Sequence, residues 1–319
     1  MVKRILTDYS ILSGLHQGKS CVIVGGSKNI DMFPYSDFKG VVISMGDVPI
    51  RGVNLFRTDY WVTANCYWPR PWNSRDADAI NFASPKMFFL STATFPLLKP
   101  EHIEYSFENS IKNIDCDVFF YDQRHFKNKC CFEEKGCCKV FKKLSIKETI
   151  QEFIAGKYNN SKFYSSGSTV ALHAFALAII MECNPIYIIG VDIPQKEADY
   201  TYYEPNDIEY LLQKFGSMGP YDLSFDLVQN TSNLNYSRYL GRFLPKFLVN
   251  NLKIWKNAFN KSVFNKSVFF PDLPQILFDF SYLAELANKS GLEVINLNPN
   301  STLVKVKGIK TMNINKLII

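Results

Sequence analysis

The sequence predicts an α/β protein built on a Rossmann-like parallel sheet with helices on both faces. Three observations predict this fold class. Short apolar segments that end in glycine or polar residues recur along the chain, a long apolar helix precedes one of them, and a helix followed by a strand forms the last unit. The chain has 319 residues, 47% of them hydrophobic, which is ample material for one large buried core.

Five segments in the first half of the chain have the composition of buried strands. The segment 20–25 is almost entirely apolar and ends in glycine. Because helices cover both faces of a parallel sheet, such a continuous apolar segment indicates a central strand. Further strands are expected at 41–44, 59–63, 86–90 and 117–121.

Two helix–strand units follow later in the chain. The residues 170–179 are apolar on nearly every side, which predicts a buried helix, and Asn184-Pro185 end it before a strand at 186–190. In the last unit a helix starts near Phe278 and stops at Gly291, and a strand follows at 292–297.

The segment 200–274 interrupts this alternation and divides the predicted domains. Residues 1–199 together with 275–319 are expected to form the Rossmann-like nucleotide-binding domain, and 200–274 a mostly helical lid insertion. No acidic residue lies between Leu227 and Pro271, whereas seven lysines and arginines do, against a formal net charge of +6 for the whole chain. This balance favours an anionic ligand or surface as a partner.

Three interpretations of that basic, aromatic segment stay open. Its cations can meet the phosphate of a ligand, its apolar side chains can rest on an anionic membrane surface, or a helix within it can pack on the core. No recognised nucleic-acid-binding module is present, so nucleic acid is not an expected partner.

Nothing in the sequence predicts a membrane-spanning or secreted protein. No apolar stretch reaches the roughly eighteen residues of a transmembrane helix. Asp8 precedes any long apolar stretch, unlike in a secretory signal. A cytoplasmic protein is expected, or one that is peripheral on the inner face of the membrane.

The eight cysteines fall into two groups. Cys130, Cys131, Cys137 and Cys138 lack the C-x₂₋₄-C spacing of zinc sites, so a redox-labile loop or reduced surface thiols are favoured over a metal site. The other four have apolar neighbours and are expected to be ordinary buried thiols; they are Cys21, Cys66, Cys116 and Cys183.

Three segments place small or polar residues where ligands bind in open α/β sheets, beyond the carboxyl ends of the strands. Gly25-Gly26-Ser27 lets phosphate or ribose approach the backbone, and a helix N-terminus after it would favour an anion. Ser165–Ser168 precede the buried helix and offer free N–H groups and hydroxyls. Gly190-Val191-Asp192 ends a strand in a carboxylate, which can bind ribose, hold Mg²⁺ or act as a base. Simple turns and caps are the structural alternatives at all three.

The order of these motifs resembles that of the Campylobacter-type lipooligosaccharide sialyltransferases and the related 6-hydroxymethylpterin diphosphokinase-like proteins. The resemblance rests on the glycine turn, Ser166-Gly167, Gly190-Val191-Asp192 and the final Pro299-Asn300-Ser301. It covers roughly 20–65, 160–195 and 275–305, and it implies a GT-A-like variant of the Rossmann-like fold.

The resemblance implies a glycosyltransferase that moves sialic acid or a related acidic sugar from a CMP-activated donor to a surface glycan. The expected partners are a nucleotide-sugar, a glycan or glycolipid acceptor and an anionic membrane surface. Neither a metal nor a further cofactor is expected. The residues expected to bind the nucleotide are Gly25, Gly26, Ser27, Asn65, Ser166, Gly167, Gly190 and Asn300.

The catalytic groups depart from the pattern of the family. Such sialyltransferases neutralise the leaving phosphate with tyrosines and use a histidine as base. Here Pro194 stands near the expected tyrosine, although Tyr200, Tyr202 and Tyr203 follow. The four histidines are at 16, 102, 125 and 173, so none lies just before the last unit. The candidate catalytic residues are His125, Asp192 and Tyr202, and His173 is expected to be a core residue.

Two other functions remain open on the sequence. A pterin-type diphosphokinase would need ATP and Mg²⁺, for which Asp192 and Asp47 are candidate ligands, but no Walker lysine accompanies them. A non-catalytic nucleotide- or glycan-binding relative would have kept the fold without the base.

Overall fold

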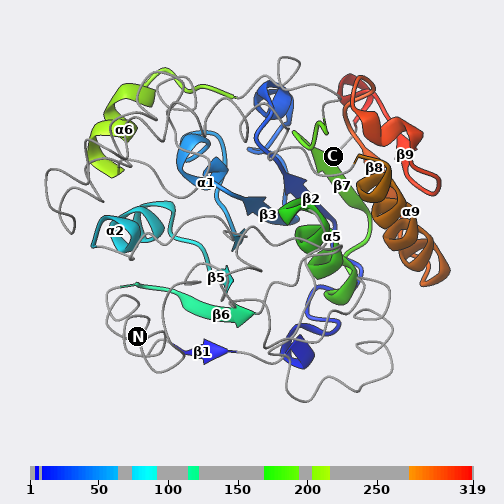
Figure 1. Ribbon diagram of the computed structural model, residues 1–319, viewed down its shortest axis with the longest axis horizontal. Coiled ribbons are helices and arrows are strands. Elements are labelled where there is room, and N and C mark those ends of the chain that lie inside the picture. The colour runs from blue at the N-terminus through cyan, green and yellow to red at the C-terminus, as the bar shows by residue number, and fades with distance from the viewer. Residues whose placement is uncertain are drawn as a thin grey trace, which may run out of the picture.

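The computed structural model describes residues 4–6, 9–63, 74–91, 114–121, 169–193, 203–215 and 273–317. Nine strands in these ranges form one sheet, ordered β1-β6-β5-β4-β3-β2-β7-β8-β9, and every neighbouring pair is parallel (Figure 1). The predicted α/β class is therefore confirmed. The strands are β1 (Ile5–Leu6), β2 (Cys21–Val24), β3 (Val41–Met45), β4 (Tyr60–Val62), β5 (Met87–Ser91), β6 (Asp117–Tyr121), β7 (Ile186–Ile189), β8 (Val294–Asn296) and β9 (Lys310–Thr311).

All seven strands expected from the sequence are present, and β1 and β9 were missed. Each of these two edge strands has only two residues, too few to show a hydrophobic pattern. The last helix begins at Leu273, earlier than expected, with Pro274 in its first turn, where proline is tolerated. The helices are α1 (Val48–Arg51), α2 (Ser74–Ala83), α5 (Val170–Ile180), α6 (Ile208–Phe215) and α9 (Leu273–Lys289).

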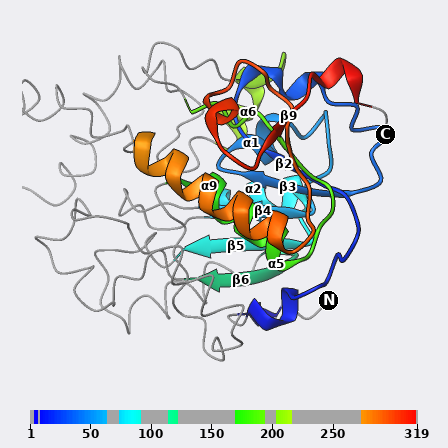
Figure 2. The same cartoon turned by 90° about the vertical axis from the view of Figure 1, so that its right-hand side faces the viewer.

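The helices divide between the two faces of the sheet. In β2, Cys21 and Ile23 belong to the cluster that contains α5 and α9, whereas Val22 and Val24 face the opposite side. Figure 2 shows α5 and α9 on the same side of the sheet. The other side carries α1, α2 and α6, with Leu211 of α6 packed among buried residues of α2. Burial on both faces explains why central strands such as β2 and β7 are apolar along their whole length.

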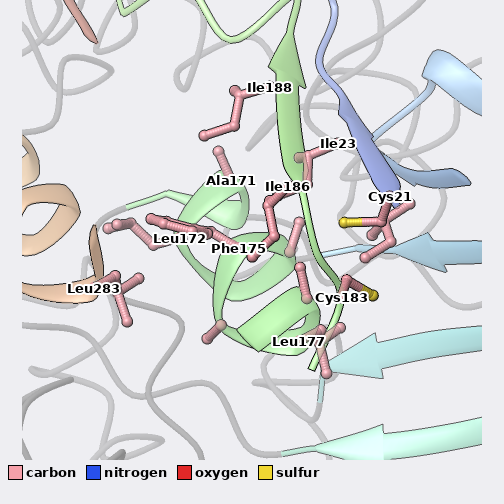
Figure 3. Packing of buried hydrophobic residues seen from close by; sticks show 14 of the residues in the cluster. Cys21, Ile23, Ala171, Leu172, Phe175, Leu177, Cys183, Ile186, Ile188 and Leu283 are labelled. Atoms are coloured by element: carbon pink, nitrogen blue, oxygen red, sulfur yellow. The ribbon is translucent and has the colours of Figure 1, made fainter. Parts of the chain in front are cut away.

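Helix α5 is buried nearly all round because it lies between the sheet and α9. Figure 3 shows Leu172 and Phe175 on the side towards Leu283 of α9, with Ile186 and Ile188 of β7 on the other side. The Phe175 ring stacks on that of Phe280, with 5.9 Å between centroids.

The direction of α5 follows from the contacts at its end. Gly14 donates its N–H to the Ile180 carbonyl and Gly18 to that of Glu182, both at 3.0 Å. Because the segment 14–18 comes shortly before the start of β2, the end of α5 lies at the amino edge of the sheet. Its first turn therefore points to the carboxyl edge.

Three cysteines were correctly expected to be buried thiols. Cys21, Cys116 and Cys183 are buried, and burial raises the pKa of Cys21, with a further contribution from its hydrogen bond to Cys183. Cys66 and the cluster at 130–138 lie outside the described residues. Among the described helices, none is long and apolar enough to cross a membrane.

Candidate functional site at the carboxyl edge of the sheet

The strand order reverses at β2, which makes the neighbouring ends of β2 and β7 the switch point of the sheet. The chain places β3 on one side of β2, while β7 and β8 lie on the other. Val24 is paired with Ile189, so Gly25 and Gly190 follow at the same level of the two strands. Open α/β sheets bind their ligands outside such a switch point.

The two glycines pack backbone against backbone. Gly25 donates its N–H to the Ile189 carbonyl at 2.8 Å, and Ser27 donates to the Gly190 carbonyl at 3.1 Å. A Cβ atom on Gly25 would lie 2.2 Å from the Gly190 carbonyl oxygen, and one on Gly190 would lie 2.4 Å from Ile30. Gly190 also has a φ of +69°, which favours glycine. Glycine is required here by the approach of the two segments, and not by the approach of a ligand to Gly25.

The turn after β2 leads into a short 3-10 helix, Lys28–Met32, and not into the α-helix that the sequence suggested. The expectation of a helix N-terminus for an anion is therefore wrong at this turn, because five residues in a 3-10 turn carry no long run of aligned peptide dipoles. Ser27 is 1% exposed and donates its hydroxyl to the Asn29 side-chain oxygen at 2.6 Å. Gly26 is the partly exposed residue of the turn.

The loop after β7 is fixed by the loop after β8. The Asn298 side-chain Nδ2 donates to Asp192 Oδ1 at 2.5 Å. The Ser301 hydroxyl donates to the Val191 carbonyl at 3.0 Å, and the Thr302 hydroxyl donates to the Ile193 carbonyl at 2.7 Å. Residues 191–193 thus all accept hydrogen bonds from side chains of the segment 298–302, which includes the Pro299–Ser301 motif.

A buried ion pair joins the end of β3 to the chain that enters α6. Arg51 Nε donates to Asp47 Oδ2 at 2.7 Å, and their side chains are only 4% and 5% exposed. Arg51 Nη1 also donates to the Tyr203 carbonyl at 3.2 Å, and Tyr203 donates its N–H to the Gly26 carbonyl at 2.9 Å. This connection was not predicted, although the i,i+4 spacing of Asp47 and Arg51 could have indicated the pair.

The same geometry weighs against Asp47 and Asp192 as two ligands of one Mg²⁺ ion. They follow β3 and β7, which are separated by β2, so these strand ends lie about 10 Å apart, twice the spacing of neighbouring strands. The Asp47 carboxylate is also engaged by Arg51. Among the described residues, no group of three His, Cys, Asp or Glu side chains gathers as a metal-binding set.

Helix α5 begins at Val170 and is capped by Thr169, one residue after the serine-rich segment that the sequence suggested as its start. Thr169 Oγ1 accepts the Ala171 N–H at 3.4 Å. Replacement of Thr169 by alanine is expected to lower the free energy of unfolding by about 1 kcal/mol, because a donor of the first turn then lacks its cap. Thr169→Ser keeps the hydroxyl and is the matched control in urea unfolding; equal stability of the alanine and serine variants would contradict the cap.

Each of the two described histidines lies within hydrogen-bonding distance of a buried tyrosine. His173 is fully buried in α5, its Nε2 lies 3.0 Å from the Tyr9 hydroxyl, and burial lowers its pKa to about 3. This confirms it as a core residue. His16, at the amino edge, has its Nε2 2.6 Å from the Tyr60 hydroxyl, and burial, assisted by Lys19 and Lys86, lowers its pKa.

Of the predicted site residues, the structure brings together those of the β2, β7 and β8 ends. Gly26 and Asp192 are partly exposed and Asn300 is exposed, whereas Gly25, Ser27 and Gly190 are buried. The remaining predicted residues lie outside the described residues; they are Asn65, His125, Ser166, Gly167 and Tyr202.

No family model and no curated protein matches the sequence. Among solved structures, the chain is similar to a variant of the sialyltransferase CST-II in complex with CMP, with 15% identity over 94% of this chain and 90% of that one, and a TM-score of 0.45. It is similar to the sialyltransferase CstII from Campylobacter jejuni in complex with the substrate analogue CMP-3FNeuAc, with 13% identity over 94% and 89% of the chains and a TM-score of 0.41.

A third similar structure is the MAf glycosyltransferase from Magnetospirillum magneticum AMB-1. The identity is 10%, 98% of this chain and 38% of that one are covered, and the TM-score is 0.41. The diphosphokinase part of the sequence resemblance receives no support from these structures.

Proposed function

We propose that the protein is a glycosyltransferase that moves sialic acid or a related acidic sugar from a CMP-activated donor to a surface glycan. One observation carries the proposal: the Gly25-Gly26-Ser27 turn and the Gly190-Val191-Asp192 loop adjoin at the switch point of the sheet. These are motifs on which the resemblance to sialyltransferases rests, and the switch point is where open α/β sheets hold nucleotides.

In this proposal the described residues have two kinds of role. Gly26, Asp192 and Asn300 offer accessible polar groups to the nucleotide, while the buried Gly25 and Gly190 keep the two segments together. The Asp192 carboxylate accepts hydrogen bonds and suits the hydroxyl and amino donors of a nucleoside. Asn65, Ser166 and Gly167 are proposed as further nucleotide contacts from the sequence.

The reaction forms a bond between an acceptor hydroxyl oxygen and the anomeric carbon of the sugar, and breaks the bond from that carbon to the CMP phosphate oxygen. The acceptor hydroxyl loses its proton to a base, for which His125 is proposed. The leaving phosphate gains negative charge, which the Tyr202 hydroxyl would stabilise by donating a hydrogen bond. No metal is required for either step.

The acceptor and the setting of the reaction are also proposals. A lipid-linked surface glycan, as in lipooligosaccharide biosynthesis, would bring the protein to the inner face of the membrane. The acid-free stretch 227–271 would then face the anionic surface, since its seven cations are attracted to acidic lipids.

A thermal-shift series with CMP, CDP, UDP, GDP and ATP, each with and without Mg²⁺, tests the nucleotide class. Saturating CMP is expected to raise the Tm by several degrees, because a ligand at about 100 times its Kd adds about 2.7 kcal/mol of stability. The rise should persist with a chelator. A shift with ATP and Mg²⁺ alone would favour the diphosphokinase, and CMP binding without sugar transfer would favour the non-catalytic relative.

Replacement of Asp192 by alanine is expected to reduce transfer from CMP-sialic acid by about 10- to 100-fold, which corresponds to the loss of one or two hydrogen bonds to a charged group. Ser166→Ala is expected to reduce it as well. The measurement is the rate of CMP release in the presence of acceptor. Asn315→Ala, at an exposed residue to which no role in the site is assigned, is the matched control. Undiminished turnover in both test variants would remove these residues from the site.

A further inference from the structure

Each end of the Asn298 side-chain amide forms a hydrogen bond, the nitrogen with an acceptor and the oxygen with a donor. Nδ2 donates to Asp192 Oδ1 at 2.5 Å, and Oδ1 accepts the Asn300 N–H at 3.0 Å. A carboxylate only accepts hydrogen bonds and a backbone N–H only donates them. The two partners therefore fix which way the amide points, and a carboxylate in its place would meet Asp192 with like charge.

The segment that carries this amide is itself anchored. Asn296, 1% exposed in β8, accepts the Asn298 N–H at 3.2 Å and donates its own amide to the Asn298 carbonyl at 2.8 Å. On the other side, Ser301 and Thr302 hold the carbonyls that flank Asp192. The Asp192 carboxylate thus meets a donor that is fixed at both ends.

Only one oxygen of Asp192 is used in this way. Within the described part of the chain, Oδ2 forms no hydrogen bond, and the residue is partly exposed at the switch point. A carboxylate that is tied at one oxygen presents the other in a set direction, which reduces the entropy lost when a ligand donor binds there.

We propose that Asn298 is a positioning residue, which orients Asp192 so that its Oδ2 accepts a hydrogen bond from a hydroxyl or amino donor of the bound nucleoside. The inference rests on the proposed function, since it presumes that a nucleotide occupies this edge. Asn298 had no role in the motifs described above. The inference assigns it one, and it assigns to Asp192 the recognition of a nucleoside donor.

The test is Asn298→Asp, which is close in size to asparagine. At about pH 5 the new carboxyl is expected to hold a proton, because the adjacent Asp192 carboxylate raises its pKa. Its O–H then donates to Asp192 and its carbonyl accepts the Asn300 N–H, much as the amide does. At about pH 8 two adjacent negative charges repel each other. By calorimetry, CMP affinity of the variant is expected within about threefold of wild type at the lower pH and about tenfold or more weaker at the higher pH.

Ligand analogues separate orientation of Asp192 from general loosening of the loop. UMP lacks the amino group of CMP, and 2′-deoxy-CMP and 3′-deoxy-CMP each lack one hydroxyl. Wild-type protein is expected to bind the analogue that lacks the donor to Asp192 about tenfold less tightly than CMP. The analogue that loses affinity identifies the donor. In Asn298→Asp at the higher pH this discrimination should disappear, because the ligand donor and Asn298 are coupled through Asp192.

Thr302→Val is the matched structural control, since it removes another anchor of the same loop without touching Asp192. It is expected to lower thermal stability and to keep the discrimination between CMP and its analogues. If Thr302→Val abolishes discrimination as Asn298→Asp does, or if Asn298→Asp binds like wild type at both pH values, the inference is overturned. If wild-type protein does not bind CMP, the proposed function fails and this inference fails with it.

Discussion

Replacement of Gly25 by alanine is expected to destabilise the protein by about 2–4 kcal/mol, and to remove stabilisation by CMP. The added Cβ would lie 2.2 Å from the carbonyl oxygen and 2.6 Å from the carbonyl carbon of Gly190, and neither backbone atom can move without displacing β7. The overlap costs about 1–3 kcal/mol, and loss of the Ser27 hydrogen bond to Gly190 adds about 1 kcal/mol or more. Urea unfolding and thermal shift measure the two effects.

Gly18→Ala is the matched control for this experiment. Gly18 has a φ of +73° and nothing within 4 Å of an added Cβ, so alanine there meets backbone strain without overlap. The expected loss is about 1 kcal/mol. A Gly25→Ala variant that is no less stable than Gly18→Ala would show that the β2 and β7 ends do not touch.

Acidification from pH 6.5 to 5 is expected to cost about 2 kcal/mol of stability through His173 alone. Burial holds the pKa of His173 at about 3 in the folded protein, against about 6.5 in an unfolded chain. Between these two values the unfolded state binds a proton that the folded state excludes, so stability falls as the pH falls. The slope for one such group is about 1.4 kcal/mol per pH unit.

The measurement compares Tyr9→Phe with the double variant Tyr9→Phe/His173→Leu. Both variants lack the Tyr9 hydroxyl, which lies within hydrogen-bonding distance of His173 Nε2. They therefore differ from each other only in the titrating imidazole ring. The single variant should lose about 2 kcal/mol more than the double variant between pH 6.5 and 5 in urea unfolding. His16, whose pKa is also lowered, contributes equally to both profiles. Parallel profiles would mean that His173 is accessible to protons in the folded state.

The central part of the fold could be predicted from the sequence because its strands are buried on both faces. Continuous apolar segments such as 20–25 and 186–190 predict β2 and β7. The apolar residues of α5 predict in the same way that this helix is buried. The strand order could not be predicted, since side-chain patterns do not say which strands pair. The two-residue strands β1 and β9 and the start of α9 are set by tertiary contacts that leave no local pattern.

The position of the candidate site could be predicted from the sequence, whereas the packing that requires its glycines could not. Strand ends with glycine or aspartate pointed to the carboxyl edge, where Gly25, Gly190 and Asp192 lie. The sequence could not show that two glycines 165 residues apart pack on each other, which removes the space beside Gly25 that a ligand was expected to use. The bonds from Asn298 to Asp192 and from Arg51 to Tyr203 were missed because the partners are remote in sequence.

The strand order also has a consequence for biosynthesis. Cys21 in β2 pairs with Val41 on one side and with Ile186 on the other. During translation the central strand therefore has one open edge until the second half of the chain has left the ribosome, and pairing of such remote segments is intrinsically slow. An apolar strand with an unpaired edge is prone to aggregate. A nascent chain of this protein would therefore benefit from a chaperone that covers β2 until β7 has been synthesised and has paired with it.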